Sequence, residues 1–161
     1  MSPVKYVEFT RAIFAAQGFP PYEWTVNETA PFTPLEKNLE ECHVALLSTG
    51  GFYIKGKQLP FDPEKNDLGF REIPKGIDVT ELAVSHNYYD HTDADRDVNC
   101  VFPIERFREL EEEGYIGELA PVNYTIMGRI FRRTALQNQI ALEITKRLKQ
   151  EGVDVLFLVP A

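Results

Sequence analysis

The densest group of chemically active side chains in this sequence lies between residues 85 and 99. The segment holds two histidines, four aspartates and one arginine within about a dozen residues. Imidazole changes its charge near neutral pH, and carboxylates accept protons or hold cations, so this composition is suited to proton transfer or to ligand binding. The side chains concerned are His86, Asp90, His91, Asp93, Asp95, Arg96 and Asp97.

One interpretation of this segment is a divalent metal site. Two histidines five residues apart, with aspartates beside them, offer nitrogen and oxygen ligands, and we expect His86, His91 and Asp93 to be the ligands. The spacing is not that of a helical i, i+4 pair, and no motif of known ligand geometry is matched. A divalent metal is therefore one open possibility, and the sequence identifies no other cofactor.

Two other interpretations compete with the metal. Asp and Asn side chains often hold turns by bonding to nearby backbone groups, which predicts a purely structural loop. Alternatively, the segment binds a small zwitterionic or carboxylate ligand, with Arg96 or Arg106 contacting the carboxylate. In that case His86 or His91 would act as the proton donor.

Secondary-structure elements must bring this segment to a common site. Apolar strands are predicted over 44–49, 81–85 and 153–159, and ligands of open parallel sheets bind beyond the carboxyl ends of the strands. The first strand ends in Ser48-Thr49-Gly50-Gly51, where backbone N–H groups can approach an anion closely. The second strand leads directly into the polar segment. We therefore expect the strand ends and the polar segment to share one pocket.

Helical spacing predicts three helices around these strands. The first covers 6–17, the second follows Pro103 and ends at Gly114, and the third ends at Gly152. Thr134 and Gln137 have the spacing of a capping box at the start of the third helix. Residues 19–34 are rich in proline and aromatic side chains, which indicates an arm that wraps the core, and residues 55–75 are rich in turn formers.

A helix, a glycine and an apolar strand in this order form half of a βαβ unit. The expected fold is α/β, a three-layer sandwich with a mainly parallel sheet, Rossmann-like. We expect one domain over 1–161, with an N-terminal arm over about 1–40 and a core over 41–161.

Bulk composition excludes several classes of function. The chain has 161 residues and a net charge of −8, without a basic cluster, which argues against nucleic-acid binding. No apolar run is long enough for a membrane span, and the N-terminus has no signal-peptide core, so we expect no membrane contact and a cytoplasmic location. The two cysteines, Cys42 and Cys100, are too far apart for a C-x-x-C motif, and we expect both to be reduced and buried.

Several stretches in order along the chain carry a resemblance to a known family. They are 32–35 (FTPL), 44–51 (VALLSTGG), 70–74 (FREIP), 85–86 (SH), 97–103 (DVNCVFP), 114–117 (GYIG), 120–121 (AP) and 152–160 (GVDVLFLVP). The sequence resembles the selenoprotein family of glycine/sarcosine/betaine reductase component B and D-proline reductase, in its N-terminal half.

This resemblance implies an oxidoreductase of amino-acid metabolism that cleaves a C–N bond reductively next to a carboxylate. It also implies a small amino-acid or betaine-like ligand. In the family a selenocysteine or cysteine just beyond the strand equivalent to 153–159 takes the organic fragment. The printed sequence stops at Ala161, so we expect it to lack that residue and to need a partner chain that carries a Cys or Sec half, or a second copy of itself.

Two further functions stay open beside this one. The chain can be a stand-alone lyase or hydrolase that uses the histidine–aspartate cluster, with or without a metal, or a non-catalytic binding or assembly protein. For the site we predict catalytic roles for His86, Asp90, His91, Asp97 and Cys100. The predicted substrate-binding residues are Ser48, Gly50, Gly51, Ser85, Asn99, Arg96 and Arg106.

Overall fold

The computed structural model describes residues 5–23, 26–31, 33–62, 64–128 and 130–161. The chain divides into two compact units, Met1–Pro34 and Leu35–Ala161. In the first unit, helix α1 spans Tyr6–Ala16, as predicted, and Gly18 follows it with a φ of +77°. None of the side chains of α1 is buried. That this arm wraps the core, within a single domain, stays a prediction, and two of its aromatics, Trp24 and Phe32, lie outside the described residues.

The second unit is built around strand β1, His43–Ser48, which has neighbours on both sides. Leu47 pairs with a residue of β7 on one side and with a residue of β6 on the other, both in parallel. Strand β5 lies on the same side as β6 and pairs in parallel with the start of β1, while β3 runs antiparallel along the outer edge of β6. These strands span Phe70–Pro74 (β3), Glu118–Leu119 (β5), Val122–Ile126 (β6) and Val155–Val159 (β7).

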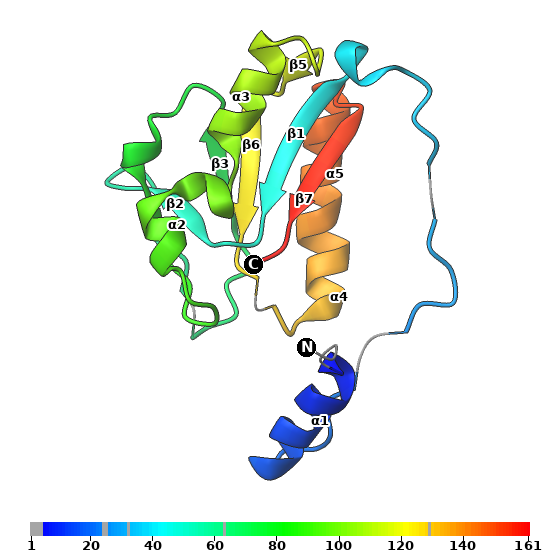
Figure 1. The fold of residues 1–161 in the computed structure, drawn as a ribbon, viewed down its shortest axis with the longest axis vertical. Coiled ribbons are helices and arrows are strands. Elements are labelled where there is room, and N and C mark those ends of the chain that lie inside the picture. Colours follow the sequence, from blue (N-terminus) through cyan, green and yellow to red (C-terminus); the bar gives the residue numbers. More distant parts are fainter. Residues whose placement is uncertain (1–4, 24–25, 32, 63, 129) are drawn as a thin grey trace. The chain divides into compact units, whose positions relative to one another are not determined.

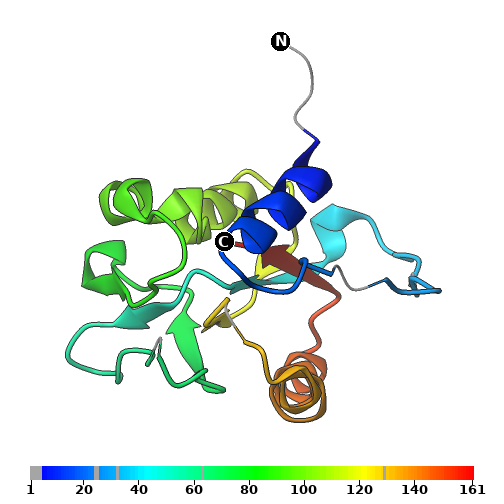
Figure 2. The ribbon, with the colours of Figure 1, turned by 90° about the horizontal axis from the view of Figure 1, so that it is seen from below.

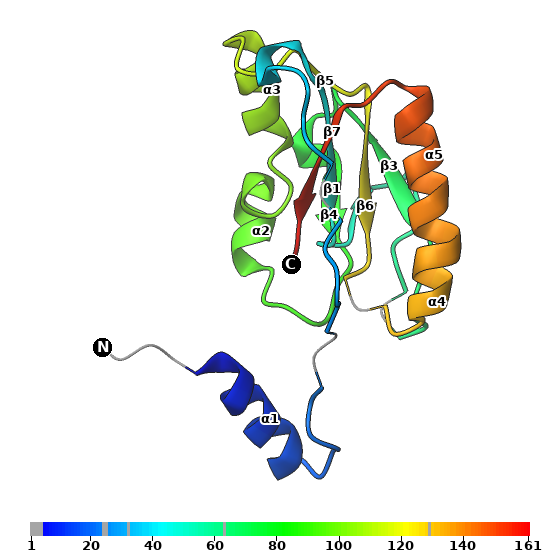
Figure 3. The same cartoon turned by 90° about the vertical axis from the view of Figure 1, so that its right-hand side faces the viewer.

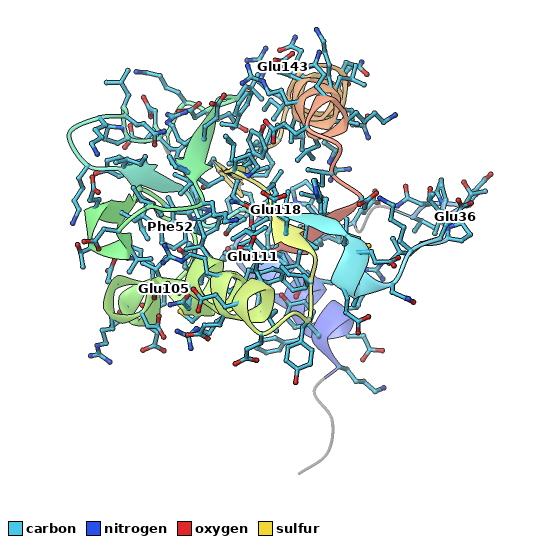
Figure 4. The ribbon with its side chains drawn as sticks, turned by 90° about the horizontal axis from the view of Figure 1, so that it is seen from above. Glu36, Phe52, Glu105, Glu111, Glu118 and Glu143 are labelled. Atoms are coloured by element: carbon cyan, nitrogen blue, oxygen red, sulfur yellow. The ribbon has the colours of Figure 1, made fainter. Side chains whose placement is uncertain are left out.

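Helices lie on both faces of this sheet (Figures 2 and 3). Helices α2 and α3 cover one face, and the continuous helical segment α4–η4–α5 covers the other. Figure 4 shows Glu105 on α3 and Glu143 on α5 at opposite sides of the strands. The helices span Thr92–Arg96 (α2), Ile104–Glu112 (α3), Arg133–Ala135 (α4), Leu136–Ala141 (η4, a π-helix) and Leu142–Gln150 (α5). Short 3₁₀ turns span Leu39–Glu41 (η1), Val79–Glu81 (η2) and Val98–Cys100 (η3).

A second, two-stranded antiparallel sheet joins β2 (Phe52–Ile54) to β4 (Leu82–Val84). The strand predicted over 81–85 is therefore present, but it pairs with β2 rather than inside the main sheet. Its residues enter the same hydrophobic core as the α3 side of β1.

Strand β1 contributes to two separate cores because its side chains alternate between the faces. Val44 and Leu46 pack in the cluster on the α3 side, whereas Ala45 and Leu47 pack in the cluster on the α5 side. A strand buried on both faces needs apolar residues at every position, which explains the continuous apolar run in the sequence.

The α/β class predicted from the sequence is confirmed, with a mixed sheet. The mainly parallel, Rossmann-like form stays a prediction. Two local expectations were wrong. The last helix begins at Arg133 without a side-chain cap, so Thr134 and Gln137 form no capping box. Strand β7 was expected to be buried, yet Phe157 and Leu158 are 46% and 61% exposed, because β7 pairs with β1 along one edge only.

Among the described residues, no helix is both long enough and apolar enough to cross a membrane.

Candidate functional site at the strand ends

The carboxyl ends of β1, β6 and β7 lie at one edge of the sheet (Figure 1). Backbone hydrogen bonds join them beyond the strands themselves. The N–H of Thr49 donates to the carbonyl of Val159 at 3.0 Å, and the N–H of Ala161 donates to Oγ1 of Thr49 at 2.8 Å. The N–H of Gly51 donates to the carbonyl of Ile126 at 3.1 Å. The Ser48–Gly51 turn is thus held against both neighbouring strands.

The glycines of this turn are required by close packing. A side chain at Gly50 would begin 2.6 Å from Val101 and 2.8 Å from the Phe52 ring. Gly51 has a φ of +70°, and a side chain there would begin 2.9 Å from the carbonyl of Ser85. Since other residues rarely adopt this φ, Gly51 lets the segment after β4 approach the end of β1, while Gly50 leaves room for Val101 and the Phe52 ring.

Ser48 and Ser85 serve to hold this arrangement. Oγ of Ser48 is fully buried and accepts from the N–H of Gly50 at 3.0 Å. The N–H of Ser85 donates to the carbonyl of Gly51 at 3.0 Å, and its Oγ donates to the carbonyl of Phe61 at 2.8 Å. These bonds hold the next residue, His86, beside the turn that ends β1.

His86 is 3% exposed and has one satisfied ring nitrogen. Its Nδ1 accepts a hydrogen bond from the backbone N–H of Tyr88 at 3.1 Å. Its Nε2 has no hydrogen-bond partner among the described residues. A methyl group added to the exposed Gly128 would lie 3.1 Å from Nε2 and 3.0 Å from the carbonyl oxygen of Thr49, so Nε2 faces the backbone between β1 and β6.

Burial lowers the pKa of His86, and the neighbouring His91 lowers it further. A neutral imidazole carries one N–H, and because Nδ1 accepts the Tyr88 N–H, the proton must sit on Nε2. Within the described part of the chain, the site therefore contains a buried N–H donor without an acceptor, which is rare in native proteins.

The ring of Tyr89 packs edge-on against the ring of His86, with the two ring centroids 4.8 Å apart. Its hydroxyl donates to the carbonyl of Gly50 at 3.1 Å. Burial first, then Asp95 and Cys100, raises the pKa of Tyr89 to about 12, so this hydroxyl stays a donor at neutral pH.

The next part of the polar segment stabilises helix α2. The Asp90 carboxylate accepts from the N–H and the hydroxyl of Thr92, at 3.0 and 2.6 Å, and the hydroxyl bond is the main cause of its lowered pKa. His91 bonds to Asp95 through Nδ1 at 2.7 Å. These contacts are those expected from the structural interpretation of the segment, in which Asp side chains hold turns.

The two arginines expected to hold a carboxylate lie on exposed helix surfaces. Arg96 pairs with Asp93 at 3.6 Å, and Arg106 pairs with Glu109 at 2.8 Å. Both pairs join residues of the same helix at i, i+3 and are open to solvent, so the structure gives each guanidinium a carboxylate partner of its own.

Asp97, Asn99 and Glu105 form a second group at the start of α3. The Asp97 carboxylate accepts from the N–H and the side-chain amide of Asn99, both at 2.9 Å, and the side-chain bond is the main cause of its lowered pKa. Asn99 also donates to Glu105 at 2.7 Å and accepts from the N–H of Glu105 at 3.1 Å. The group links η3 to the first turn of α3.

A cavity of about 490 Å³ lies next to this second group, bordered by Phe52, Val84 and Glu105. Figure 4 shows Phe52 and Glu105 on the same side of the sheet. Carboxylates and cations both line it, Asp97 with Lys55 for example. The cavity therefore belongs to the β2–β4 and α2–α3 side of the molecule.

Cys100 is exposed, contrary to the expectation of a buried thiol, because it ends the short turn η3 at the surface; Cys42 is buried as expected. The Cys100 thiol donates to the carbonyl of Asp97 at 3.0 Å. Partial burial first, and then the negative charges of Asp97 and Asp93, raise its pKa. Such surroundings disfavour the reactive thiolate.

No group of three or more His, Cys, Asp or Glu side chains that could hold a metal lies within the described part of the chain. The expected ligands are engaged elsewhere, since His91 bonds to Asp95 and Asp93 pairs with Arg96.

The structure thus brings together five of the predicted site residues at the strand ends, whereas Arg96 and Asp97 line the cavity beside α2 instead. Those gathered at the strand ends are Ser48, Gly50, Gly51, Ser85 and His86. Sequence reasoning missed Thr49, Tyr89 and Gly128. Thr49 and Tyr89 lie within motifs that were noted, whereas Gly128 follows a strand that was not predicted, and no sequence signal marked it.

Comparison with known proteins defines the class. Residues 21–161 match the family described as glycine/sarcosine/betaine reductase selenoprotein B. The chain belongs to this family, as its sequence motifs predicted.

Among curated relatives, the D-proline reductase subunit gamma of Acetoanaerobium sticklandii is 38% identical over 130 residues, which cover 79% of this chain and 52% of that protein. The glycine reductase complex component B subunit gamma of Carboxydothermus hydrogenoformans is 29% identical over 136 residues, or 81% of this chain and 31% of that protein. The betaine reductase complex component B subunit beta of Peptoclostridium acidaminophilum is 30% identical over 131 residues, which cover 76% of this chain and 28% of that protein. The chain therefore spans about half the length of the first relative and about a third of the others. No solved structure matches it.

Proposed function

We propose that this chain forms the substrate-binding part of an amino-acid reductase that cleaves a C–N bond next to a carboxylate. Membership of the selenoprotein B family is the observation that carries the proposal. The ligand site is the set of strand ends around Ser48–Gly51 and His86. Its position beyond the carboxyl ends of parallel strands supports this, since open α/β sheets bind ligands there.

The names of the relatives indicate the chemistry of the ligand. They are reductases of D-proline, glycine, sarcosine and betaine. These four compounds share a carboxylate one carbon away from a nitrogen, and betaine has no N–H. The carboxylate is thus their common hydrogen-bond acceptor, and the ligand class we propose is a small α-amino or α-ammonio carboxylate.

The residue that attacks the substrate comes, in this proposal, from outside these 161 residues. Neither cysteine suits the role, because Cys42 is buried away from solvent and the raised pKa of Cys100 keeps it a thiol. A Cys- or Sec-bearing partner chain would complete the site, whereas a second copy of the chain would cover the sheet edge without supplying that residue. The relatives are named as subunits of reductase complexes, and the outer edge of β7 has no paired strand in the described residues, which both support assembly.

The finer fold assignment belongs to the same proposal. We infer a three-layer, Rossmann-like sandwich of mainly parallel strands, which β5, β6 and β7 support because each runs parallel to β1. Ligand binding at the strand ends follows from that architecture.

Ligand binding can be measured by thermal unfolding with glycine, sarcosine, betaine and D-proline. A ligand at a hundred times its Kd adds about 2.7 kcal/mol to the stability of the folded chain. D-Prolinamide is the matched control, because it keeps the ring nitrogen but lacks the carboxylate. Stabilisation by at least one of the four acids, and not by the amide, is expected. An unchanged Tm with all four acids would contradict the proposal.

Reductive cleavage needs a second assay. The chain is co-expressed with Cys- or Sec-bearing subunits of a D-proline reductase complex, purified with any partner, and supplied with D-proline and a dithiol. Mass spectrometry should detect the ring-opened amino acid in which the C–N bond is replaced by C–H and N–H. If the chain stays a pure monomer that binds the acids but shows no activity with any of those subunits, the proposed ligand binding stands and the proposed reductase role is contradicted.

A further inference from the structure

The buried imidazole of His86 has a defined protonation pattern that the fold imposes. The N–H of Tyr88 is always a donor, so the Nδ1 it reaches at 3.1 Å must carry a lone pair. A protonated ring would turn an N–H of Nδ1 toward the N–H of Tyr88, which is repulsive. His86 is therefore held as the neutral tautomer with its proton on Nε2.

That Nε2–H has no acceptor among the described residues, although His86 is only 3% exposed. Leaving a buried donor unpaired is costly, so this N–H is available to an acceptor such as a water or a ligand atom. The donor faces Gly128, which is exposed and has no side chain, and a methyl group there would begin 3.1 Å from Nε2. An oxygen atom arriving over Gly128 therefore has no side chain to displace at that position.

We infer that the Nε2–H of His86 binds a carboxylate oxygen of the substrate at the strand ends, as a fixed neutral donor and not as a source of protons. The inference rests on the proposed function for the ligand class. It assigns the carboxylate to His86 instead of Arg96 or Arg106, which are paired with Asp93 and Glu109 on exposed helix surfaces.

The carbonyl oxygen of Thr49 extends the inference to the nitrogen of the ligand. It lies 3.0 Å from the position of a Cβ on Gly128, and Nε2 lies 3.1 Å from the same position. A donor for the carboxylate and an acceptor for an ammonium group thus border one point beside Gly128. This pair matches the two ends of a small amino acid, whereas betaine could use the donor alone because its nitrogen carries no hydrogen.

The test is ¹H–¹⁵N NMR of the 161-residue chain labelled at histidine, titrated with D-proline and with glycine. In the free chain His86 should show a protonated Nε2 and an unprotonated Nδ1, and either probe should shift the Nε2–H signal saturably. A free-state spectrum with the proton on Nδ1, or with both nitrogens protonated at neutral pH, would overturn the inference.

Two variants separate binding from folding. His86→Leu removes the donor and should weaken probe binding by at least about tenfold, while His86→Gln, whose amide can donate from a similar position, should recover part of it. Gly128→Ala places a methyl group beside Nε2 and should weaken binding even if His86→Leu fails to fold. Gly76→Ala is the matched control, since a side chain there meets nothing within 4 Å, and His43→Gln is the control at the opposite end of β1.

The outcomes for His86 and for the proposed function can be told apart. If wild-type chain binds D-proline or glycine, and His86→Leu and Gly128→Ala bind equally well, the role of His86 is overturned and the proposed function stands. If the wild-type chain shows no saturable change with either probe, the ligand class fails, and the assignment of the carboxylate to His86 fails with it.

Discussion

The side-chain Oδ1 of Asn123 accepts a hydrogen bond from the backbone N–H of Leu46 at 2.8 Å, in the centre of the sheet. The other end of the same amide donates to the carbonyl of Ala120 at 3.1 Å. Leu46 lies between the part of β1 that pairs with β5 and the part that pairs with β6. The fully buried Asn123 thus bridges the break that Pro121 introduces between these two strands.

Asn123→Leu should destabilise the chain, because it leaves a buried N–H and a buried carbonyl without partners. The expected cost is about 1–3 kcal/mol for each group left unpaired. Urea unfolding followed by circular dichroism measures it. Asn138→Leu is the matched exchange at an exposed position and should change stability by less than about 0.5 kcal/mol. Equal stability of the two variants would show that the bridge is dispensable.

Gly51→Ala should both destabilise the chain and displace His86. The alanine would adopt an unfavourable φ of +70°, and its methyl group would lie 2.9 Å from the carbonyl of Ser85 and 3.2 Å from Cβ of His86. Gly56→Ala separates the two effects, since Gly56 has the same φ of +70° but no neighbour within 4 Å. Gly51→Ala should therefore lower the Tm further than Gly56→Ala and weaken D-proline binding, which Gly56→Ala should leave unchanged. Similar losses in both variants would argue that only backbone strain matters.

Sequence patterns predicted the elements whose burial is regular. Strand β1 has a continuous apolar run, and α3 and α5 have apolar residues at helical spacing, so their periodicity follows directly from what they pack against. Strand β6 was missed because its buried residues include Asn123 and Thr125. These polar side chains serve backbone groups, since Oγ1 of Thr125 accepts from the N–H of Phe52 at 3.0 Å, and no local pattern reveals a partner that distant.

The candidate site was predictable only in part, for a related reason. A polar segment after an apolar strand indicated where ligands could bind, and His86 lies there. Which of the polar side chains point inward depends on turns. Asp90 and Asp97 each bond two residues ahead along the chain, so these local bonds occupy their carboxylates. Gly128 acquires its importance from the distance to Nε2 of His86, which no one-dimensional pattern contains.

Stability should decrease as the pH falls below 6.5, and His86 should account for part of the decrease. Its pKa in the folded chain lies below the ordinary 6.5, first because of burial and then because of His91. The folded state therefore binds fewer protons than the unfolded state, so the contribution is complete above pH 6.5 and is lost as the pH falls toward the folded pKa. Urea unfolding at several pH values between neutral and mildly acidic measures this slope.

The exchange His86→Gln should flatten that slope, while His43→Gln should retain the part that His86 contributes. Asp90 and Asp97 do not confuse the measurement, because their pKa values lie below 3.8 and their contributions are lost at lower pH. An unchanged slope in His86→Gln would mean that His86 titrates alike in the folded and unfolded chain.

Cys100 should react slowly with iodoacetamide at neutral pH although it is exposed. Partial burial and the carboxylates of Asp97 and Asp93 raise its pKa, so the thiolate fraction is lower than in a free thiol. Intact-mass spectrometry against time, with glutathione as the reference thiol, measures the rate. In Asp97→Asn the rate should rise, because a negative charge is removed. Alkylation of the native chain faster than that of glutathione would contradict the assignment and return Cys100 to the catalytic candidates.

Leu46→Asp and Leu158→Asp should have opposite consequences, although both leucines lie on strands of the same sheet. Leu46 is completely buried in the core on the α3 side, so an unpaired carboxylate there costs several kcal/mol, comparable to the whole stability of a domain, and should prevent folding. Leu158 is 61% exposed on the edge strand β7, and its aspartate variant should fold and remain soluble. Circular dichroism and size-exclusion chromatography distinguish the two. If Leu158→Asp folds but no longer associates with a partner or a second copy that binds the wild type, the surface around Leu158 is where the complex assembles; if it binds as before, assembly uses another surface.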